Sequence, residues 1–289
     1  MKIIIVLFSL FNLSVLLINP INYGVEFQDC DSIPQSPIDI TYLNPNKIKF
    51  PSFPAFLLNN TFYKPINARD FQYTGKDNNC PPSGSTLSYN DLIMDLTGFG
   101  QAYVLYLNKT VKYNLKELRL RVYSEHTFEG GKMDLELQII HEIDDESKSV
   151  LPTTKYGEKL GISVLFSISR DKKNKLLEQL IKEDTDQTDE TKRYTFNNVT
   201  SFDLNQFTNF HEPYYFYIGS GTTPYDCCEK IDWIVMKKVE YMSEKQLRQI
   251  QIAMKNLAPS LIYGNARKAD ISEVPSIEYI ANVERDEDE

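Results

Sequence analysis

The fold prediction rests on two stretches of sequence, Leu118-Arg119-Leu120-Arg121-Val122 and Met133-Asp134-Leu135-Glu136-Leu137-Gln138-Ile139-Ile140-His141. In the first, apolar and charged residues alternate with a period of two, which is typical of a β-strand and places Arg119 and Arg121 on one face of a sheet. In the second, the same period places Glu136, Gln138 and Ile140 on one face, opposite Leu135, Leu137, Ile139 and His141. Both stretches are therefore predicted to be strands that carry polar side chains on one face.

Other strand-like segments dominate the middle of the chain. They are rich in Val, Ile, Leu and Tyr and are bounded by turn residues: Tyr103 to Leu107, Leu115 to Val122, Met133 to His141 and Ile162 to Ile168. Helices are predicted for Lys173 to Lys182 and for Ser243 to Asn256, where Ser243 and Gln246 have the spacing of a capping box. The polar segment Glu183 to Arg193 is predicted to be a solvated loop. The sequence thus predicts a mainly β (α+β) domain with peripheral helices.

The composition excludes several classes of protein. The chain has 289 residues, of which 42% are hydrophobic and 25% charged, so it is neither collagen-like nor wholly disordered. The formal net charge of −9 argues against a nucleic-acid binder, which needs basic surface to neutralise phosphates. The sequence has three histidines, and a zinc site built from histidines would need almost all of them.

The N-terminus has the pattern of a secretory signal. Lys2 precedes an apolar run from Ile3 to Ile18, which is too short and too early for a membrane span. We predict a signal peptide over residues 1–24, a domain over residues 25–270 and a C-terminal extension over residues 271–289 with an acidic tail from Glu284 to Glu289. A retained signal anchor is the alternative. With no later segment of transmembrane length, the mature chain is expected to be secreted, extracellular or on the cell surface, with no membrane span after signal removal.

Secretion determines how the cysteines and sequons are interpreted. In an oxidising compartment Cys30, Cys80, Cys227 and Cys228 can form two disulfides with three connectivities. The vicinal pair is not expected to bond to itself because the ring would be strained. Three Asn-x-Thr sequons predict N-glycosylation at Asn59, Asn108 and Asn198.

Several spaced motifs resemble one family. Gln35-Ser36-Pro37-Ile38-Asp39-Ile40 follows Cys30, Ser124-Glu125-His126-Thr127 leads to the strand ending at His141, and Gly219-Ser220-Gly221-Thr222-Thr223-Pro224 precedes Trp233-Ile234-Val235. In order and spacing these blocks resemble the α-class carbonic anhydrases, from about Cys30 to Arg267. The resemblance implies a twisted, largely antiparallel sheet whose cavity holds zinc on three histidines. It also implies a disulfide between Cys30 and Cys227.

At the positions that match the family's three zinc ligands, this sequence has Arg119, Arg121 and Gln138. A guanidinium stays protonated and offers no lone pair, and an amide is a poor zinc ligand. The position of the family's proton-shuttling histidine best matches Gln101, which cannot shuttle a proton at neutral pH. No metal and no cofactor are therefore expected. His126 and His141 match positions with structural hydrogen bonds, and His211 is expected to be exposed.

The residues that surround the family's metal site are still present. Glu125 and Thr222 match the pair that orients the zinc-bound hydroxide, Glu136 matches the carboxylate behind a metal-bound histidine, and Thr223 follows Thr222. We expect Arg119, Arg121, Glu125 and Glu136 to form a charge network that replaces the zinc, with Gln138 bridging. In one version, this remnant pocket binds a small anion through the two guanidiniums; in the other, which we favour, the arginines only satisfy the carboxylates and close the cavity.

The resemblance therefore leads to two hypotheses of different class. In the first, the protein is a secreted, glycosylated carbonic-anhydrase-like pseudoenzyme that binds protein partners in an extracellular or surface assembly. In the second, it retains altered carbonate dehydratase or esterase activity with an unusual metal site. Zinc content and CO2 hydration separate the two.

Overall fold

The computed structural model describes residues 34, 36–40, 48–49, 51, 55–67, 72–77, 88–152, 155–184, 193–196, 200–209, 211–223, 229–257 and 276–281. The predicted signal peptide, the four cysteines, Asn198 and the acidic tail lie outside the described residues. The strands are β1 (Asp39–Ile40), β2 (Ile48–Lys49), β3 (Phe56–Tyr63), β4 (Ile66–Asn67), β5 (Gln72–Asp77), β6 (Ser88–Asp95), β7 (Gly100–Tyr106), β8 (Lys109–Arg121), β9 (Thr127–Phe128), β10 (Gly131–Lys132), β11 (Leu135–Ile143), β12 (Lys159–Ile168), β13 (Ile181–Asp184), β14 (Arg193–Phe196), β15 (Thr200–Phe202), β16 (Tyr214–Ser220), β17 (Lys230–Met236), β18 (Glu240–Met242) and β19 (Ile277–Ile280). The helices are α1 (Lys175–Leu180) and α2 (Glu244–Leu257), with 3₁₀ turns η1 (Asp145–Ser147) and η2 (Leu204–Gln206).

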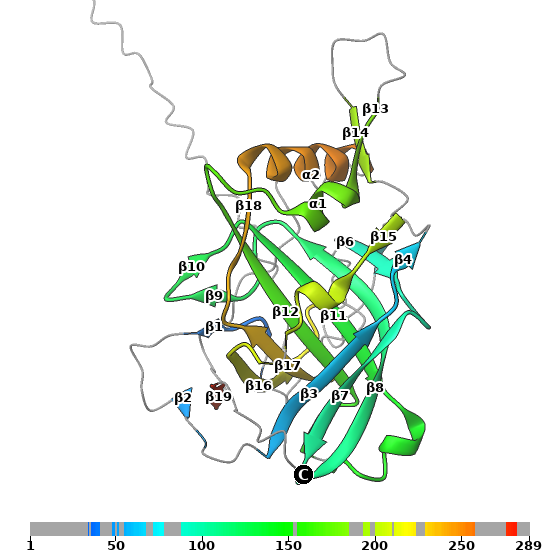
Figure 1. Ribbon diagram of the computed structural model, residues 1–289, viewed down its shortest axis with the longest axis vertical. Helices are drawn as coiled ribbons and strands as arrows, with labels where there is room; N and C mark the ends of the chain where they lie inside the picture. The colour runs from blue at the N-terminus through cyan, green and yellow to red at the C-terminus, as the bar shows by residue number, and fades with distance from the viewer. Residues whose placement is uncertain are drawn as a thin grey trace, which may run out of the picture.

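A twisted sheet of 12 strands forms the body of the molecule (Figure 1). Its main path runs β2-β19-β16-β17-β12-β11-β8-β6-β5, and β3, β7 and β18 pair beside this path. Most neighbours are antiparallel, whereas the pairs β12–β17, β12–β18 and β2–β19 are parallel. The prediction of a mainly β fold with a largely antiparallel sheet and peripheral helices is confirmed.

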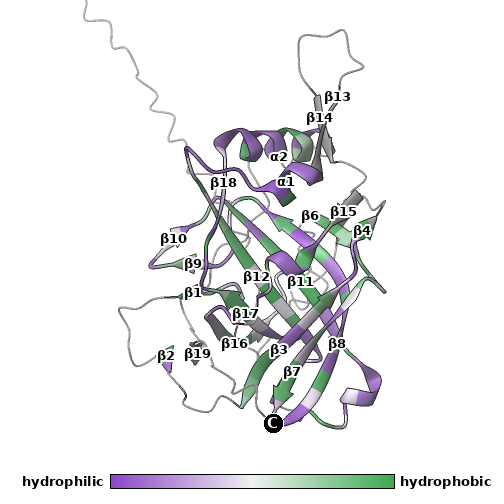
Figure 2. Cartoon of the chain, viewed as in Figure 1, coloured by the Kyte–Doolittle hydropathy of each residue, from purple (hydrophilic) through white to green (hydrophobic). Residues whose placement is uncertain are grey.

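The two faces of the sheet bury different side chains. On β16, Tyr214 and Phe216 belong to the larger hydrophobic cluster, and Tyr215 and Tyr217 belong to the smaller one. This division follows from the period of two, because successive side chains point to opposite faces. Leu118, Leu120, Leu135, Leu137 and Ile139 all lie in the larger cluster. Figure 2 shows the hydrophobic residues along the central strands and hydrophilic residues along much of α2 and the peripheral connections.

The helices gather at one end of the sheet, next to the β13–β14 hairpin (Figure 1). The capping box predicted at the start of α2 is confirmed: Gln246 N donates to Ser243 Oγ over 3.2 Å, and Ser243 N donates to Gln246 Oε1 over 3.0 Å. The predicted helix over Lys173 to Lys182 is too long. Helix α1 ends at Leu180 because the next residues form β13, which pairs antiparallel with β14. Both strands include ends of the segment that was predicted to be a loop.

The packed structure continues past the predicted domain boundary at residue 270. Strand β19 pairs antiparallel with β16 and parallel with β2, and Ile277 is fully buried in the smaller hydrophobic cluster. Residues 277–280 of the predicted C-terminal extension therefore belong to the sheet. Among the described residues, no helix is long and apolar enough to cross a membrane.

Candidate functional site

The register between β8 and β11 brings the predicted site residues together. Arg119 lies opposite Gln138, and Arg121 lies opposite Glu136. Side chains directly opposite each other in an antiparallel pair share a face and are close enough to interact. Since the apolar neighbours of these residues fill the larger hydrophobic cluster, the four polar side chains project from the other face of the sheet. All four are buried.

The carboxylate of Glu136 is the most heavily hydrogen-bonded group of the site. Its Oε2 accepts from the backbone N–H groups of Glu125 and His126 at 2.7 and 3.0 Å. Its Oε1 lies 2.7 Å from His126 Nδ1 and accepts from Ser163 Oγ over 2.8 Å. Burial alone would raise the pKa of the Glu136 carboxyl. The electrostatic interaction and hydrogen bond with His126, together with the hydrogen bonds from Ser163 and Gln138, outweigh burial and lower this pKa to about 2. Glu136 is therefore a fixed anion.

Gln138 joins this anion to a second carboxylate. Its Nε2 donates to Glu125 Oε2 over 2.7 Å and to Glu136 Oε1 over 3.1 Å. Its Oε1 accepts from Thr222 Oγ1 over 3.2 Å. An amide has two N–H donors and one carbonyl oxygen, so both polar ends of Gln138 are engaged with protein groups.

The two arginines have different carboxylate partners. Arg121 Nε lies 3.3 Å from Glu125 Oε1, and both side chains are 1% exposed. Arg119 instead donates to Glu117 Oε1, with both Nε and the terminal nitrogen at 2.6 Å. The sequence analysis did not include Glu117, although the alternation of residues 117, 119 and 121 places it on the same face.

Further contacts of this site come from elements distant in sequence. His126 Nε2 lies 2.8 Å from the hydroxyl of Tyr217, which donates to Ser36 Oγ over 3.0 Å. The edge of the Trp233 ring packs against His126 with the ring centroids 5.0 Å apart. Sequence analysis missed Ser36, Ser163 and Tyr217 as members of the site, since no local pattern connects them to β11.

The other two histidines lie away from this network. His141 Nε2 hydrogen-bonds the Tyr63 hydroxyl at 2.9 Å, and His141 Nδ1 lies 3.2 Å from Leu160 O. Burial lowers the pKa of His141 to about 4, against opposing backbone hydrogen bonds at Leu160 and Ile139. His211 is exposed. The buried hydrogen bonds expected for His126 and His141 are thus present, as is the exposure expected for His211.

Gln101 and Thr223 are the remaining predicted site residues. Gln101 lies on β7 opposite Asn114, and its Oε1 accepts from the Tyr103 hydroxyl. Gln101 also lies opposite Phe62 of β3, so its described neighbours are on β3, β7 and β8 and not in the Glu136 network. Thr223 is fully buried, next to Thr222.

The donor set on this face does not fit a zinc ion. Protonated guanidiniums cannot coordinate a metal, and the carbonyl oxygen of Gln138 already accepts from Thr222. A catalytic zinc site needs three protein ligands and an open position. In the part of the chain that the structure describes, no group of three or more His, Cys, Asp or Glu residues could hold a metal ion.

Comparison with known proteins identifies the family to which this fold belongs. Residues 19–270 match the family model of eukaryotic-type carbonic anhydrase. The chain belongs to the carbonic anhydrase family.

Curated relatives include dioscorins and a receptor-type tyrosine-protein phosphatase. Dioscorin dioA3 of Dioscorea japonica is 32% identical over 194 residues, covering 66% of this chain and 62% of that protein. This chain therefore spans less than two thirds of the dioscorin's length. Human receptor-type tyrosine-protein phosphatase zeta is 29% identical over 242 residues, covering 80% of this chain and 9% of the phosphatase.

Solved structures share the carbonic anhydrase fold at low identity. A crystal structure of dioscorin complexed with ascorbate covers 88% of this chain and 88% of its own, with a TM-score of 0.59 and 24% identity. The α-carbonic anhydrase of Thermovibrio ammonificans, in complex with sulfanilamide, covers 85% of this chain and 86% of its own, with a TM-score of 0.54 and 20% identity.

Proposed function

We propose that this member of the carbonic anhydrase family is a pseudoenzyme without hydratase activity. The observation that carries the proposal is the position of the Gln138 amide, which matches a zinc ligand of the family but contacts Glu125, Glu136 and Thr222. The carbonyl oxygen of Gln138 already accepts from Thr222, and a neutral amide oxygen is a poor ligand for zinc. The carboxylates that would support a metal site are instead satisfied by protein donors.

The positive charges of two buried arginines support the same proposal. Arg119 and Arg121 are both buried on the Gln138 face, and each keeps its positive charge at any physiological pH. The two guanidiniums would repel a dication, and the carboxylates of Glu117 and Glu125, which would attract one, already have protein partners. Arg121 and Glu125 form a buried ion pair, and removing one partner from such a pair is costly. The network therefore favours the metal-free state.

We further propose that the protein acts as a secreted, non-catalytic binding or structural module with a protein partner. The relationship to a receptor-type phosphatase, of which the matched region is only 9%, supports use of this domain as one module among others. The signal pattern, the sequons and a disulfide between Cys30 and Cys227 all belong to this proposal. Their common requirement is passage through an oxidising compartment.

A small anion on Arg119 and Arg121 is the second candidate function. Two buried guanidiniums on one face suit a bidentate acceptor such as a carboxylate. The crystal structure of dioscorin, a protein of the same fold, is a complex with ascorbate, which is an anion at neutral pH. Titration with bicarbonate, acetate and ascorbate, followed by calorimetry, tests this site. Absence of binding at millimolar concentration would leave the arginines with a structural role alone.

The main proposal is tested on the secreted full chain purified in the presence of zinc. We expect zinc well below one ion per chain by mass spectrometry and CO2 hydration at the rate of buffer alone. An active α-carbonic anhydrase, purified and assayed in parallel, is the positive control. Stoichiometric zinc together with hydration above background would overturn the proposal and favour the residual-activity hypothesis.

A further inference from the structure

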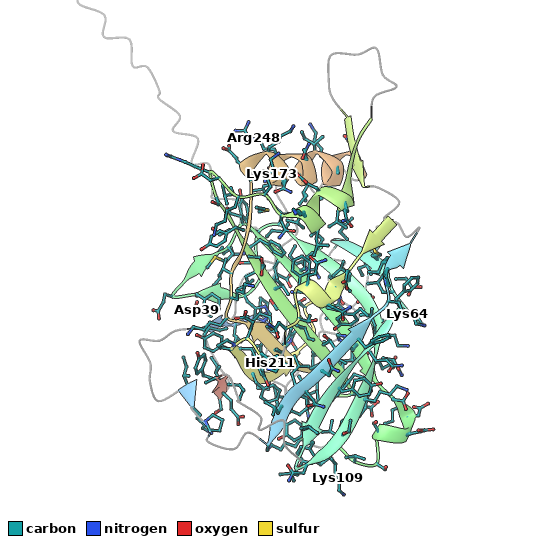
Figure 3. The ribbon with its side chains drawn as sticks, in the orientation of Figure 1. Asp39, Lys64, Lys109, Lys173, His211 and Arg248 are labelled. Atoms are coloured by element: carbon teal, nitrogen blue, oxygen red, sulfur yellow. The ribbon has the colours of Figure 1, made fainter. Side chains whose placement is uncertain are left out.

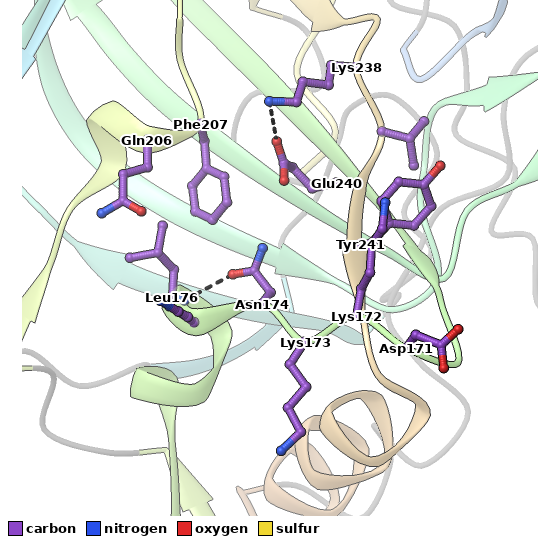
Figure 4. Close-up of a pocket in the computed structure, with 12 residues that line it drawn as sticks. Asp171, Lys172, Lys173, Asn174, Leu176, Gln206, Phe207, Lys238, Glu240 and Tyr241 are labelled. Atoms are coloured by element: carbon purple, nitrogen blue, oxygen red, sulfur yellow. Dashed lines mark hydrogen bonds and ion pairs between the residues drawn. The ribbon is translucent and has the colours of Figure 1, made fainter.

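A second site candidate lies at the helical end of the molecule. A groove of about 1010 Å³ lies between the segment that leads into α1 and the residues from Lys238 to Tyr241, which include the start of β18 (Figure 4). The lining includes four lysines, namely Lys172, Lys173, Lys175 and Lys238. The volume is at the upper end of the range for small-molecule sites, and so has room for several linked rings.

The lysines give this groove a charge opposite to that of the whole protein. The chain has a net charge of −9, yet four lysines line the groove with only two acidic residues, Asp171 and Glu240. Two of the four lysines are partly neutralised: Lys238 Nζ lies 3.2 Å from Glu240 Oε1 and 3.9 Å from Glu212 Oε1, and Lys173 Nζ lies 3.8 Å from Glu178 Oε1. Lys172 and Lys175 form no ion pair within the part of the chain that the structure describes.

The backbone that carries these lysines is held in place by hydrogen bonds to α2. Gln246 Oε1 accepts from Asn174 N over 3.0 Å, and Gln246 Nε2 donates to Asn174 O over 2.7 Å. Asn174 Oδ1 in turn accepts from the backbone N–H groups of Leu176 and Leu177 at the start of α1. Gln246 is also the partner of Ser243 in the capping box of α2. The segment around Asn174 is therefore hydrogen-bonded to the first turns of both helices. A ligand would therefore meet lysines on a preorganised backbone.

The groove also offers an aromatic face and neutral polar groups. Tyr241 is 42% exposed, and Lys172 Nζ lies over one face of its ring, 3.9 Å from the ring centre, so a ligand would pack on the part of the ring that Lys172 leaves open. Gln206 is exposed on the opposite wall, and the Asn174 amide nitrogen points into the space between them (Figure 4). Amide groups donate to and accept from hydroxyls, and an exposed tyrosine offers a flat apolar surface with a polar tip.

We propose that this groove binds an anionic oligosaccharide. Its sulfate or carboxylate groups contact Lys172, Lys173 and Lys175, its hydroxyls bond to Asn174 and Gln206, and one sugar ring packs on Tyr241. Amines, amides and a single aromatic face in one groove match a ligand with charges, hydroxyls and apolar ring faces. An acidic peptide would pair with the lysines, and its backbone could bond to the amides, but a run of acidic residues has no apolar ring face to pack on Tyr241. This site is separate from the Glu136 network and does not depend on the absence of hydratase activity.

Calorimetric titration of the intact protein tests the proposal with four probes. These are a sulfated heparin-derived hexasaccharide, an oligogalacturonate of equal length, a neutral cello-hexaose and a hexaglutamate peptide. The test variant is Lys172→Gln/Lys173→Gln/Lys175→Gln, and the matched control is Lys49→Gln/Lys64→Gln/Lys109→Gln, which removes three exposed lysines elsewhere on the molecule (Figure 3 shows Lys64 and Lys109 far from Lys173). Tyr241→Ala tests the aromatic face.

We expect one or both anionic saccharides to bind, and the better of the two identifies sulfate or carboxylate as the preferred group. The groove triple variant should weaken that binding by about tenfold or more, because hydrogen bonds to charged groups are lost. The control triple should change it by less than about twofold, since distant exposed charges are screened. Tyr241→Ala should also weaken the binding. Absence of binding by both anionic saccharides, equal binding of cello-hexaose, tighter binding of hexaglutamate, or equal loss in the control triple would each overturn the proposal.

Discussion

Gln138 Nε2 donates to Glu125 Oε2 over 2.7 Å, so an amide links a buried carboxylate to the strand that carries the family's zinc-ligand position. The same nitrogen reaches Glu136, and the carbonyl oxygen accepts from Thr222. Each of these groups would be an unsatisfied buried polar group without its partners. The stability of this region should therefore depend on Gln138 more than on a typical glutamine.

Gln138→Ala should destabilise the protein by about 1–3 kcal/mol, which is the cost of leaving buried hydrogen-bonding partners unsatisfied. Chemical denaturation followed by tryptophan fluorescence measures this change, because the one tryptophan, Trp233, lies near the site. Gln101→Ala is the matched control and should cost less, since Gln101 is only partly buried. Equal decreases in the free energy of unfolding of the two variants would mean that the Gln138 hydrogen bonds do not stabilise the fold more than those of Gln101.

Arg121→Met should cost about 3–5 kcal/mol, because it leaves the Glu125 carboxylate buried without its cation. The double variant Arg121→Met/Glu125→Gln should be more stable than Arg121→Met alone, since it also removes the stranded charge. A double-mutant cycle on the free energy of unfolding measures the coupling. Additive effects of the two substitutions would contradict a direct ion pair.

Acid should weaken the fold through Glu136 at low pH. The folded pKa of this carboxyl is about 2, below its ordinary value of 4.5, so the unfolded state takes up the proton first as the pH falls. The contribution of Glu136 is complete above pH 4.5 and is lost between pH 4.5 and pH 2, an effect on the order of 3 kcal/mol. Unfolding free energies across this window should fall less steeply in Glu136→Gln than in the unchanged protein. Parallel curves would rule out the low pKa.

His141 should affect the pH dependence of stability at higher pH than Glu136 does. Burial lowers the folded pKa of His141 to about 4 from an ordinary 6.5, so protonation favours the unfolded state. Stability should therefore decline as the pH falls from 6.5 to 4, and His141→Gln should flatten this decline. His211→Gln, which replaces an exposed histidine, is the control substitution. An unaltered slope in His141→Gln would contradict the assignment.

Of the two described sequons, Asn108 is the better placed for a glycan. Asn108 is exposed at the turn between β7 and β8, where its φ is 64°. Asn59 is half-buried within β3, and the Thr61 hydroxyl of its sequon lies 2.8 Å from Thr208 Oγ1. In secreted protein, Asn108→Gln should remove one glycan from most of the chains in an electrophoretic shift assay, whereas Asn59→Gln should shift a smaller fraction of them. The reverse pattern would contradict this ranking.

Much of the site follows from the period of two in the sequence. Alternation alone placed Arg119 and Arg121 on one face, and the order of motifs aligned them with Gln138. The same alternation places Glu117 on the face of Arg119, with which it pairs. The expected network did not include Glu117 because only residues that match the family's site were considered. Ser163, Tyr217 and Ser36 could not be found in this way, since tertiary packing alone brings them to His126 and Glu136.

The errors in the fold prediction have the same origin. The helical spacing of residues 173–182 gave no sign that Ile181 begins a strand, because that strand depends on a partner across a connection of several residues. Likewise β19 is short and is stabilised by strands far away in sequence, so nothing local distinguished it from an extension.

The central claim is that the Gln138 network occupies the place of a metal site. Its most direct test is an anomalous difference map at the zinc absorption edge, from crystals of the intact protein grown with excess zinc. We expect no peak among Arg119, Arg121 and Gln138, with the Gln138 amide in contact with both Glu125 and Glu136. A zinc peak at that position, with Gln138 or a carboxylate turned toward it, would show that this face still binds a metal.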